Sequence, residues 1–223
     1  MTSALVILSG GLDSTTLLYD IVKSNLHDSV YAISFNYGQR HSRELRCASV
    51  TTQRLDINHT IVDMHSTGSL LSSALTSSDI DVPHEAYDDD SQRLTVVPNR
   101  NMIMISIAAG VAISKGASFL YYGAHSNDAA IYPDCRPQFV DAMQQALEYC
   151  HYDPIYLSAP YLLMTKGDIV KRGLDLGVHY EDTWTCYEGG SIACGKCGSC
   201  DERLKAFAEA GSIDPIPYNV LEF

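Results

Sequence analysis

Short apolar runs alternate with segments of helical periodicity along the chain. The first run, residues 5–8, is unbroken, as in a buried parallel strand, and residues 15–22 then carry apolar side chains at helical spacing. The same patterns predict strands at residues 5–8, 29–36, 60–63, 119–123 and 155–160. They predict helices at residues 15–22, 42–55, 102–113, 137–150 and 165–176.

This alternation predicts an α/β fold with a doubly wound, mainly parallel five-stranded sheet and helices on both faces. In such sheets, ligands bind beyond the carboxyl ends of the strands. We therefore expect the turn at residues 38–41 to lie beside the turn at residues 9–14. Arg40 and His41 belong to the first of these turns, although from position alone surface residues at a helix start are the simpler interpretation.

One long segment breaks the alternation. From residue 66 to residue 95 the periodicity fades, which predicts a long loop or lid. Asp88, Asp89 and Asp90 lie in this segment. Because consecutive side chains point in different directions, we interpret them as a solvated loop and not as a metal site.

The helix predicted at residues 102–113 is apolar nearly all round, so we expect it to be buried. Arg100 lies near the start of this helix, where the helix dipole disfavours a cation. A bound anion would resolve that conflict.

The composition narrows the class of protein. The chain has 223 residues, 46% of them hydrophobic, which fits one α/β domain at residues 1–180 and a small appendage at residues 181–223. A formal net charge of −12 argues against a non-specific nucleic-acid or anionic-membrane surface and favours a small-molecule substrate. We expect no signal peptide and no membrane span, and hence a cytoplasmic protein.

A glycine turn, Ser9-Gly10-Gly11-Leu12-Asp13-Ser14, joins the first strand to the first helix. Gly10 and Gly11 lack a Cβ and can take a positive φ, so backbone N–H groups can converge on an anion at the helix N-terminus. The hydroxyl side chains that can add donors are Ser9, Ser14 and Thr15. The turn therefore predicts a phosphate site.

Asp13 carries a charge that opposes a phosphate unless a cation lies between them, so we interpret it as a partner of Mg²⁺. The alternative is that Asp13 or Ser14 is only an N-cap and that the glycines form only a tight turn. The segment has neither a Walker lysine nor a dinucleotide-binding G-x-G-x-x-G.

Two further segments are candidates for the site. Residues 123–137, between a strand end and a helix start, are rich in Asp, Arg, Cys and Pro, as in a binding site or in ordinary turn chemistry. Thr165 and Asp168 have the spacing of a capping-box variant at a helix start. Lys166 lies there and can neutralise a bound phosphate group, although an exposed lysine is an equally simple account.

Four cysteines crowd into one segment near the end of the chain. Their spacing, with glycines between them, allows four thiolates to reach one ion tetrahedrally, as in a structural zinc site: Cys186, Cys194, Cys197 and Cys200. An iron–sulfur cluster is the rival, but ferredoxin runs place the fourth cysteine after the triplet and before a proline, and here it precedes the triplet. Free thiols are a third possibility.

The glycine turn resembles the signature of the PP-loop ATP pyrophosphatases, which cut ATP between the α and β phosphates. With the other motifs, nearly the whole chain resembles the 7-cyano-7-deazaguanine synthase family. The motifs that carry the resemblance are Ser9-Gly10-Gly11-Leu12-Asp13-Ser14, Tyr37-Gly38-Gln39-Arg40-His41, Val97-Pro98-Asn99-Arg100-Asn101, Tyr132-Pro133-Asp134-Cys135-Arg136, Thr183-Trp184-Thr185-Cys186-Tyr187 and Cys194-Gly195-Lys196-Cys197-Gly198-Ser199-Cys200.

The resemblance implies an adenine nucleotide alpha hydrolase-like fold and an ATP-dependent carbon–nitrogen ligase of queuosine biosynthesis. Its substrates would be 7-carboxy-7-deazaguanine, ammonia and ATP, its ions Mg²⁺ and Zn²⁺, and its assembly a homodimer. It implies that ATP lies on Leu8, Ser9, Gly10, Gly11, Leu12, Asp13, Ser14, Thr15, Arg40 and His41. The deazapurine would lie on Asn99, Arg100, Asp134 and Arg136, with Asp134 at the guanine-like N–H edge.

The expected catalytic residues are Asp13, Lys166 and Arg100. One departure is Ala129-Ala130-Ile131 before Tyr132, where the family pattern has a Ser-Gly pair, and this leaves the shape of the purine pocket open. The rival functions are another PP-loop adenylating enzyme, such as a tRNA thiolase or an amide ligase, and a non-enzymatic zinc-containing nucleic-acid-binding protein. The acidic balance and the lack of a separate RNA-binding module count against both.

Overall fold

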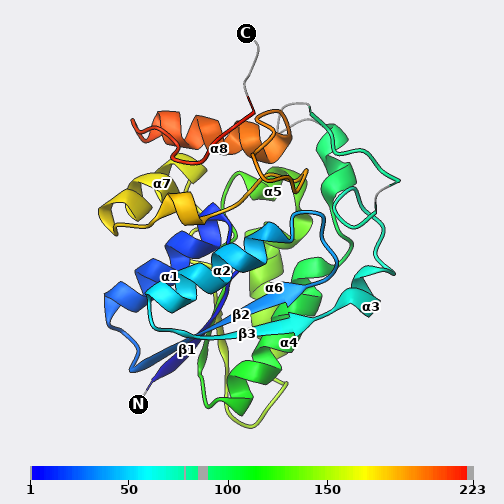
Figure 1. The fold of residues 1–223 in the computed structure, drawn as a ribbon. Helices are drawn as coiled ribbons and strands as arrows, with labels where there is room; N and C mark the ends of the chain where they lie inside the picture. The colour runs from blue at the N-terminus through cyan, green and yellow to red at the C-terminus, as the bar shows by residue number, and fades with distance from the viewer. Residues whose placement is uncertain (1, 78, 85–89, 220–223) are drawn as a thin grey trace.

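The sheet has five parallel strands in the order β3-β2-β1-β4-β5 (Figure 1). In this computed structural model, which describes residues 2–77, 79–84 and 90–219, the strands are β1 (Ser3–Ile7), β2 (Ser29–Asn36), β3 (Asn58–Asp63), β4 (Phe119–Tyr121) and β5 (Tyr156–Ser158). The predicted doubly wound parallel sheet is therefore confirmed. Its direction of winding reverses at β1, between β2 and β4.

Strand β1 is buried on both faces, which explains its unbroken apolar run. Leu5 packs into one core with residues of α4 and α6, whereas Ala4 and Val6 pack into a second core on the opposite face. Successive side chains of a strand point to opposite faces, so each face needs its own apolar residues. Leu5 pairs in register with Tyr31 of β2 and Leu120 of β4.

Helices cover both faces of the sheet, with α1, α2, α7 and α8 on one side and α4 and α6 on the other (Figure 1). The α-helices are α1 (Leu12–Ser24), α2 (Arg43–Arg54), α3 (His65–Gly68), α4 (Arg100–Ser114), α5 (Asp128–Ile131), α6 (Pro137–Leu147), α7 (Lys166–Asp175) and α8 (Gly198–Glu209). Short 3-10 helices lie at η1 (Asp90–Thr95), η2 (Pro133–Cys135) and η3 (Tyr180–Asp182).

Helix α7 begins as its sequence predicts. The Thr165 hydroxyl accepts a hydrogen bond from the Asp168 backbone N–H, and the Asp168 carboxylate accepts one from the Thr165 N–H, both at 3.1 Å. This reciprocal capping box satisfies two donors that a helix start leaves free. It fixes the position at which Lys166 enters the helix.

The described stretch Ser91–Ser114 is apolar enough, by length and composition, to cross a bilayer. This differs from the expectation that the chain has no run of that length. Its α-helix, α4, has only 15 residues, and it packs Met104, Ile105 and Ala108 into the core. About 20 residues are needed to span a bilayer, so packing against the sheet explains the apolar character of α4.

The segment between β3 and α4 contains α3, η1 and turns, as expected for a long loop. Ala74, Leu75 and Gln92 in this segment are buried, so the described part packs against the domain. Asp88 and Asp89 of the acidic triplet lie outside the described residues, and η1 begins at Asp90.

The cysteine-containing segment packs against the α/β domain at several places, two of which bear on the site. Helix α8 contributes Ala206 and Phe207 to the same core as α1 and α7. The Trp184 backbone N–H donates a hydrogen bond of 3.0 Å to the Gly10 carbonyl in the glycine turn. The boundary at residue 180 stays a prediction.

Candidate functional site

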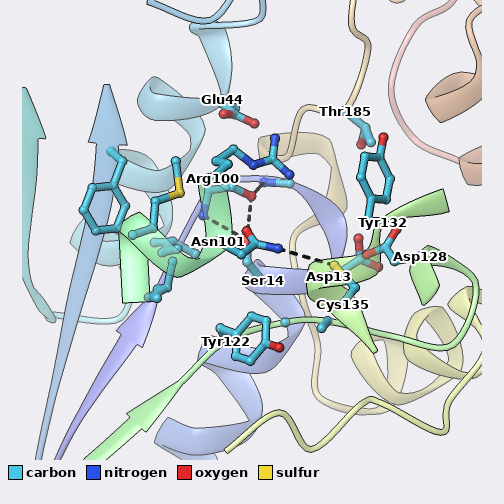
Figure 2. A pocket seen from close by; sticks show the side chains of 18 of the residues that line it. Asp13, Ser14, Glu44, Arg100, Asn101, Tyr122, Asp128, Tyr132, Cys135 and Thr185 are labelled. Carbon is cyan, nitrogen blue, oxygen red and sulfur yellow. Dashed lines mark hydrogen bonds between the residues drawn. The ribbon is translucent and has the colours of Figure 1, made fainter. Parts of the chain in front are cut away.

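A cavity of about 210 Å³ lies at the carboxyl ends of β1, β2 and β4 (Figure 2). This is the place where a doubly wound sheet binds its ligand, because the strand order reverses at β1. The cavity is lined by part of the glycine turn, by Tyr37, His41 and Glu44, by the start of α4, by residues 122–124, by Lys166, and by Trp184, Thr185 and Tyr187. Segments far apart in sequence therefore share one site.

The glycine turn forms one end of the cavity. Gly10 has a φ of +92°, and a Cβ there would lie 2.0 Å from the Glu44 carbonyl oxygen, so only glycine fits. The Ser9 hydroxyl accepts a hydrogen bond from the Gly11 N–H at 3.1 Å, and it lies 2.9 Å from the Ser14 hydroxyl. These short donors at the start of α1 are the groups that bind phosphate oxygens in such turns.

Asp13 follows the turn and lies in a set of buried charges. Its Oδ2 is 3.4 Å from Lys166 Nζ and 3.7 Å from His125 Nε2. Burial acts to raise the pKa of Asp13, but the charges of Lys166 and His125 outweigh it and hold the pKa well below the usual range. Asp13 is therefore ionised at neutral pH.

Lys166 is only 5% exposed, which excludes the exposed-lysine alternative. Besides Asp13, it makes an ion pair with Glu202 of α8. Burial acts to lower the pKa of Lys166, but the charges of Asp13 and Glu202 raise it above its ordinary value. A fixed positive charge beside the glycine turn suits a triphosphate.

His125 is fully buried beside this pair, with Nε2 3.3 Å from Asp128 Oδ2. Burial acts to lower the pKa of His125, but the Asp128 and Asp13 carboxylates outweigh it and raise the pKa to about 9. Asp13 Oδ1 is buried and has no hydrogen-bond partner among the described residues. A carboxylate oxygen left in this state fits a divalent cation, the role predicted for Asp13.

Arg100 lines the cavity from the start of α4 (Figure 2). Its Nη1 donates a hydrogen bond of 3.3 Å to the Tyr37 hydroxyl, and no carboxylate of the described chain lies within 4.0 Å of its guanidinium. Burial acts to lower the pKa of Arg100, but Tyr37, Tyr132 and Asp134 outweigh it, so the side chain is charged. A half-buried cation without a carboxylate in ion-pair contact is a site for a ligand anion.

The structure brings many of the predicted residues to the cavity and leaves others outside its wall. Those that line it are Leu8, Ser9, Gly11, Asp13, Ser14, His41, Arg100 and Lys166. Those that do not are Gly10, Leu12, Thr15, Arg40, Asn99, Asp134 and Arg136.

Three of the charged side chains off the wall have local hydrogen-bond partners, whereas the buried Thr15 hydroxyl has none among the described residues. Asp134 accepts a hydrogen bond of 3.2 Å from the Asn101 backbone N–H and so caps the start of α4. Arg136 donates to the Ala129 carbonyl at 2.9 Å, and Arg40 to the Ile80 carbonyl at 3.4 Å. Asn99 takes a left-handed backbone conformation at the N-cap of α4.

Sequence reasoning missed several residues of the site. Glu44 and Glu202 are buried carboxyl groups, yet each lies in a helix where a glutamate ordinarily faces solvent. His125 lies in the segment that was singled out after β4, but no role was assigned to it. Tyr187 lines the cavity from the cysteine-containing segment.

The four predicted cysteine ligands converge. Their sulfur atoms all lie within 4.8 Å of one another, and Cys194 Sγ is 3.9 Å from Cys200 Sγ. A tetrahedral site with metal–sulfur distances of about 2.3 Å separates its sulfurs by about 3.8 Å, so the cluster fits one ion such as zinc. Hydrogen bonds from the other three cysteines, of which that from Cys186 has the largest effect, lower the pKa of Cys194. A lower pKa favours the thiolate form, which is the form that binds a metal.

The parallel sheet, the glycine turn at its switch point and the buried lysine beside that turn define a doubly wound α/β protein with a phosphate-type turn. Two solved structures share this fold. The U34-tRNA thiolase NcsA of Methanococcus maripaludis, with its [4Fe-4S] cluster, has a TM-score of 0.53 and 16% identity over 83% of this chain and 60% of that chain. A predicted tRNA methyltransferase subunit of Methanocaldococcus jannaschii has a TM-score of 0.52 and 14% identity over 100% of this chain and 94% of that chain.

Sequence comparison identifies the family. The pattern described as queuosine biosynthesis protein QueC matches residues 3–211, and the chain belongs to this family. It is 51% identical to the 7-cyano-7-deazaguanine synthase of Methanoregula boonei, over 96% of this chain and 98% of that protein. It is 54% identical to that of Caldicellulosiruptor bescii, over 97% of each. The expected family is confirmed.

Proposed function

We propose that this protein converts 7-carboxy-7-deazaguanine to 7-cyano-7-deazaguanine with ATP and ammonia, as an ATP-dependent carbon–nitrogen ligase of queuosine biosynthesis. One observation carries the proposal. A phosphate-type turn with a buried lysine shares one cavity with a half-buried arginine, Arg100, that has no carboxylate of the described chain within 4.0 Å. This arrangement offers two anion subsites, one for the triphosphate and one for an acid.

The chemistry needs two activations, because a carboxylate is a poor electrophile. A carboxylate oxygen of the substrate attacks the α-phosphorus of ATP, and pyrophosphate leaves. Ammonia then displaces AMP to form the amide and releases a proton. The amide oxygen then attacks the α-phosphorus of a second ATP, which releases pyrophosphate and one nitrogen proton, and loss of AMP with the second nitrogen proton leaves the nitrile.

The protein groups supply position and charge. Lys166 neutralises the developing pyrophosphate, and the hydroxyl and N–H donors of Ser9, Gly11 and Ser14 hold phosphate oxygens. Arg100 holds the substrate carboxylate close to the α-phosphate, which replaces a bimolecular encounter with an oriented one. Asp13 would hold Mg²⁺, which supplies charge neutralisation on the phosphates when bound.

We also propose that Cys186, Cys194, Cys197 and Cys200 hold a structural Zn²⁺. Four sulfur ligands leave no open coordination position, so the ion would shape the site without taking part in the reaction. None of the seven cysteines, all of which lie in the described part of the chain, forms a disulfide. Free cysteines are typical of the reducing cytoplasm, where we place the protein. A homodimer stays a prediction, which light scattering can test.

Two experiments test the function. Incubation of 7-carboxy-7-deazaguanine with ATP, Mg²⁺ and ammonium should yield the nitrile, read by mass. A substrate labelled with ¹⁸O in its carboxylate should deliver the label into AMP, and label found only in phosphate would refute adenylation. Thiolation of tRNA, amide ligation and simple nucleic-acid binding are not favoured, since the relatives that match nearly the whole chain are named as synthases.

A further inference from the structure

A guanine-type ring presents two parallel donors, its N1–H and its 2-amino group, on one edge. A carboxylate accepts such a pair with both oxygens, and an ionised acceptor makes each hydrogen bond stronger. Asp134 was expected to have this role, but it is not on the cavity wall and instead caps α4. If the proposed function holds, another acceptor must read this edge.

The described wall of the cavity carries three carboxyl groups, those of Asp13, Glu44 and Asp128. Two of them lie at the glycine-turn end and already have charged partners. Asp13 is held by Lys166 and His125, and Asp128 lies 3.3 Å from His125. Only Glu44 lies away from this charged set.

Glu44 has one oxygen engaged and one available. Its Oε1 accepts a hydrogen bond of 3.1 Å from Gln39 Nε2 and lies 3.5 Å from His41 Nε2. No hydrogen bond from the described part of the chain reaches Oε2. Figure 2 shows the Glu44 carboxylate at the edge of the cavity beside Arg100.

The neighbouring wall suits a flat ring. Phe35, Tyr37 and Tyr187 line the same cavity, and the Tyr187 ring lies 5.8 Å from that of His41. Planar aromatic faces stack on a heteroaromatic ring, while a polar group at the rim reads its edge. Glu44 combines with this wall to form a recognition site for a planar base.

The electrostatics of Glu44 agree with this geometry. Burial raises the pKa of the Glu44 carboxyl to about 8, against smaller opposing effects of Gln39 and Arg100. The protein itself thus provides too few donors to hold the carboxylate ionised. Two N–H donors from a ligand would supply what is missing.

We propose that Glu44 binds the N1–H and 2-amino edge of the 7-deazaguanine ring and selects guanine-type rings over rings that lack the amino group. This inference rests on the proposed function and deepens it by naming the specificity-determining residue. In this arrangement Arg100 binds the 7-carboxylate of the substrate, and Glu44 accepts hydrogen bonds from the N1–H and the 2-amino group of the ring.

The test measures dissociation constants by calorimetry with a non-hydrolysable ATP analogue present. The two ligands are 7-carboxy-7-deazaguanine and the same compound without the 2-amino group. The wild-type protein should prefer the amino compound by roughly 10- to 100-fold, as expected for a hydrogen bond to a charged group. Glu44→Gln, whose amide nitrogen opposes two donors, should reduce this preference to about threefold or less. The matched control Glu148→Gln changes an exposed glutamate after α6 and should keep the full preference.

Each other outcome overturns the inference. If Glu44→Gln keeps the full preference for the amino compound, or if Asp134→Asn loses it instead, a residue other than Glu44 binds the N1–H and 2-amino edge. Weaker binding of the ATP analogue alone would place Glu44 in the nucleotide subsite. If circular dichroism shows that Glu44→Gln is unfolded, the ratio of the two dissociation constants of the wild-type protein decides. Equal binding of both ligands by the wild-type protein would mean that no residue recognises the 2-amino group. A wild-type protein that binds neither ligand refutes the proposed function itself.

Discussion

Replacing Gly10 by alanine tests whether the glycine turn is shaped by its close approach to α2. The added Cβ would lie 2.0 Å from the Glu44 carbonyl oxygen and 2.8 Å from the Ala48 backbone nitrogen. Both are backbone atoms of α2, on the side that packs against the sheet, so neither can move alone. The φ of +92° is also unfavourable for any residue with a Cβ.

The expected cost follows from these two effects. A left-handed conformation costs roughly 1–2 kcal/mol for a residue with a Cβ. Overpacking against a closely packed element adds typically about 1–3 kcal/mol. Gly10→Ala should therefore lower the free energy of unfolding by roughly 2–5 kcal/mol, a large share of the ~5–15 kcal/mol of an ordinary domain. If the turn shifts to relieve the contact, affinity for ATP should fall by about tenfold or more, or ~1.4 kcal/mol.

Urea unfolding measures the first quantity, and calorimetry with an ATP analogue measures the second. The matched control is Gly110→Ala on α4, where a Cβ would have no atom within 4 Å. This change should stabilise the protein by roughly 0.5–1 kcal/mol, since alanine favours a helix. A Gly10→Ala protein with wild-type stability and wild-type ATP affinity would refute the reasoning.

Three further predictions concern charge, metal and pH. Lys166→Met leaves Asp13 and Glu202 without their buried cation, so it should abolish nitrile formation and lower the free energy of unfolding by about 3–5 kcal/mol, measured by product mass and urea unfolding. Cys197→Ser should lower the zinc content per chain, measured by elemental analysis, and also the affinity for ATP, because the cysteine-containing segment touches the glycine turn; unchanged zinc would count against the four-sulfur site. Between pH 4.5 and about 8, the Glu44 carboxyl is protonated in the folded protein and ionised in the unfolded chain, so the ligand-free protein should lose stability as the pH rises through this window. The Glu44→Gln protein should lack this contribution, and parallel pH profiles of the two proteins would contradict it.

The local elements were predictable because their signals are local. The apolar run at β1, the helical spacing of α1 and the capping box at Thr165 all depend on neighbours within a few residues, and the structure has each of them. The cysteine cluster was predictable for the same reason, since its spacing brings four sulfurs to one point.

The cavity wall was less predictable, because it depends on tertiary contacts. Lys166 looks like an exposed lysine until α8 brings Glu202 to it, across 36 residues of sequence. Asp134 is in a motif that resembles a substrate site, but a backbone N–H of α4 takes its carboxylate. Glu44 is on a helix whose pattern shows no sign of the cavity beside it.

The hydrogen bond between Trp184 and Gly10 joins the end of the chain to its beginning. During synthesis, the glycine turn leaves the ribosome long before the segment that supports it. A prematurely ended chain would carry the glycine turn without Trp184, Thr185 and Tyr187, which complete the cavity. Completion of the cavity therefore waits for synthesis of residues 184–187, so shorter products lack one side of the site.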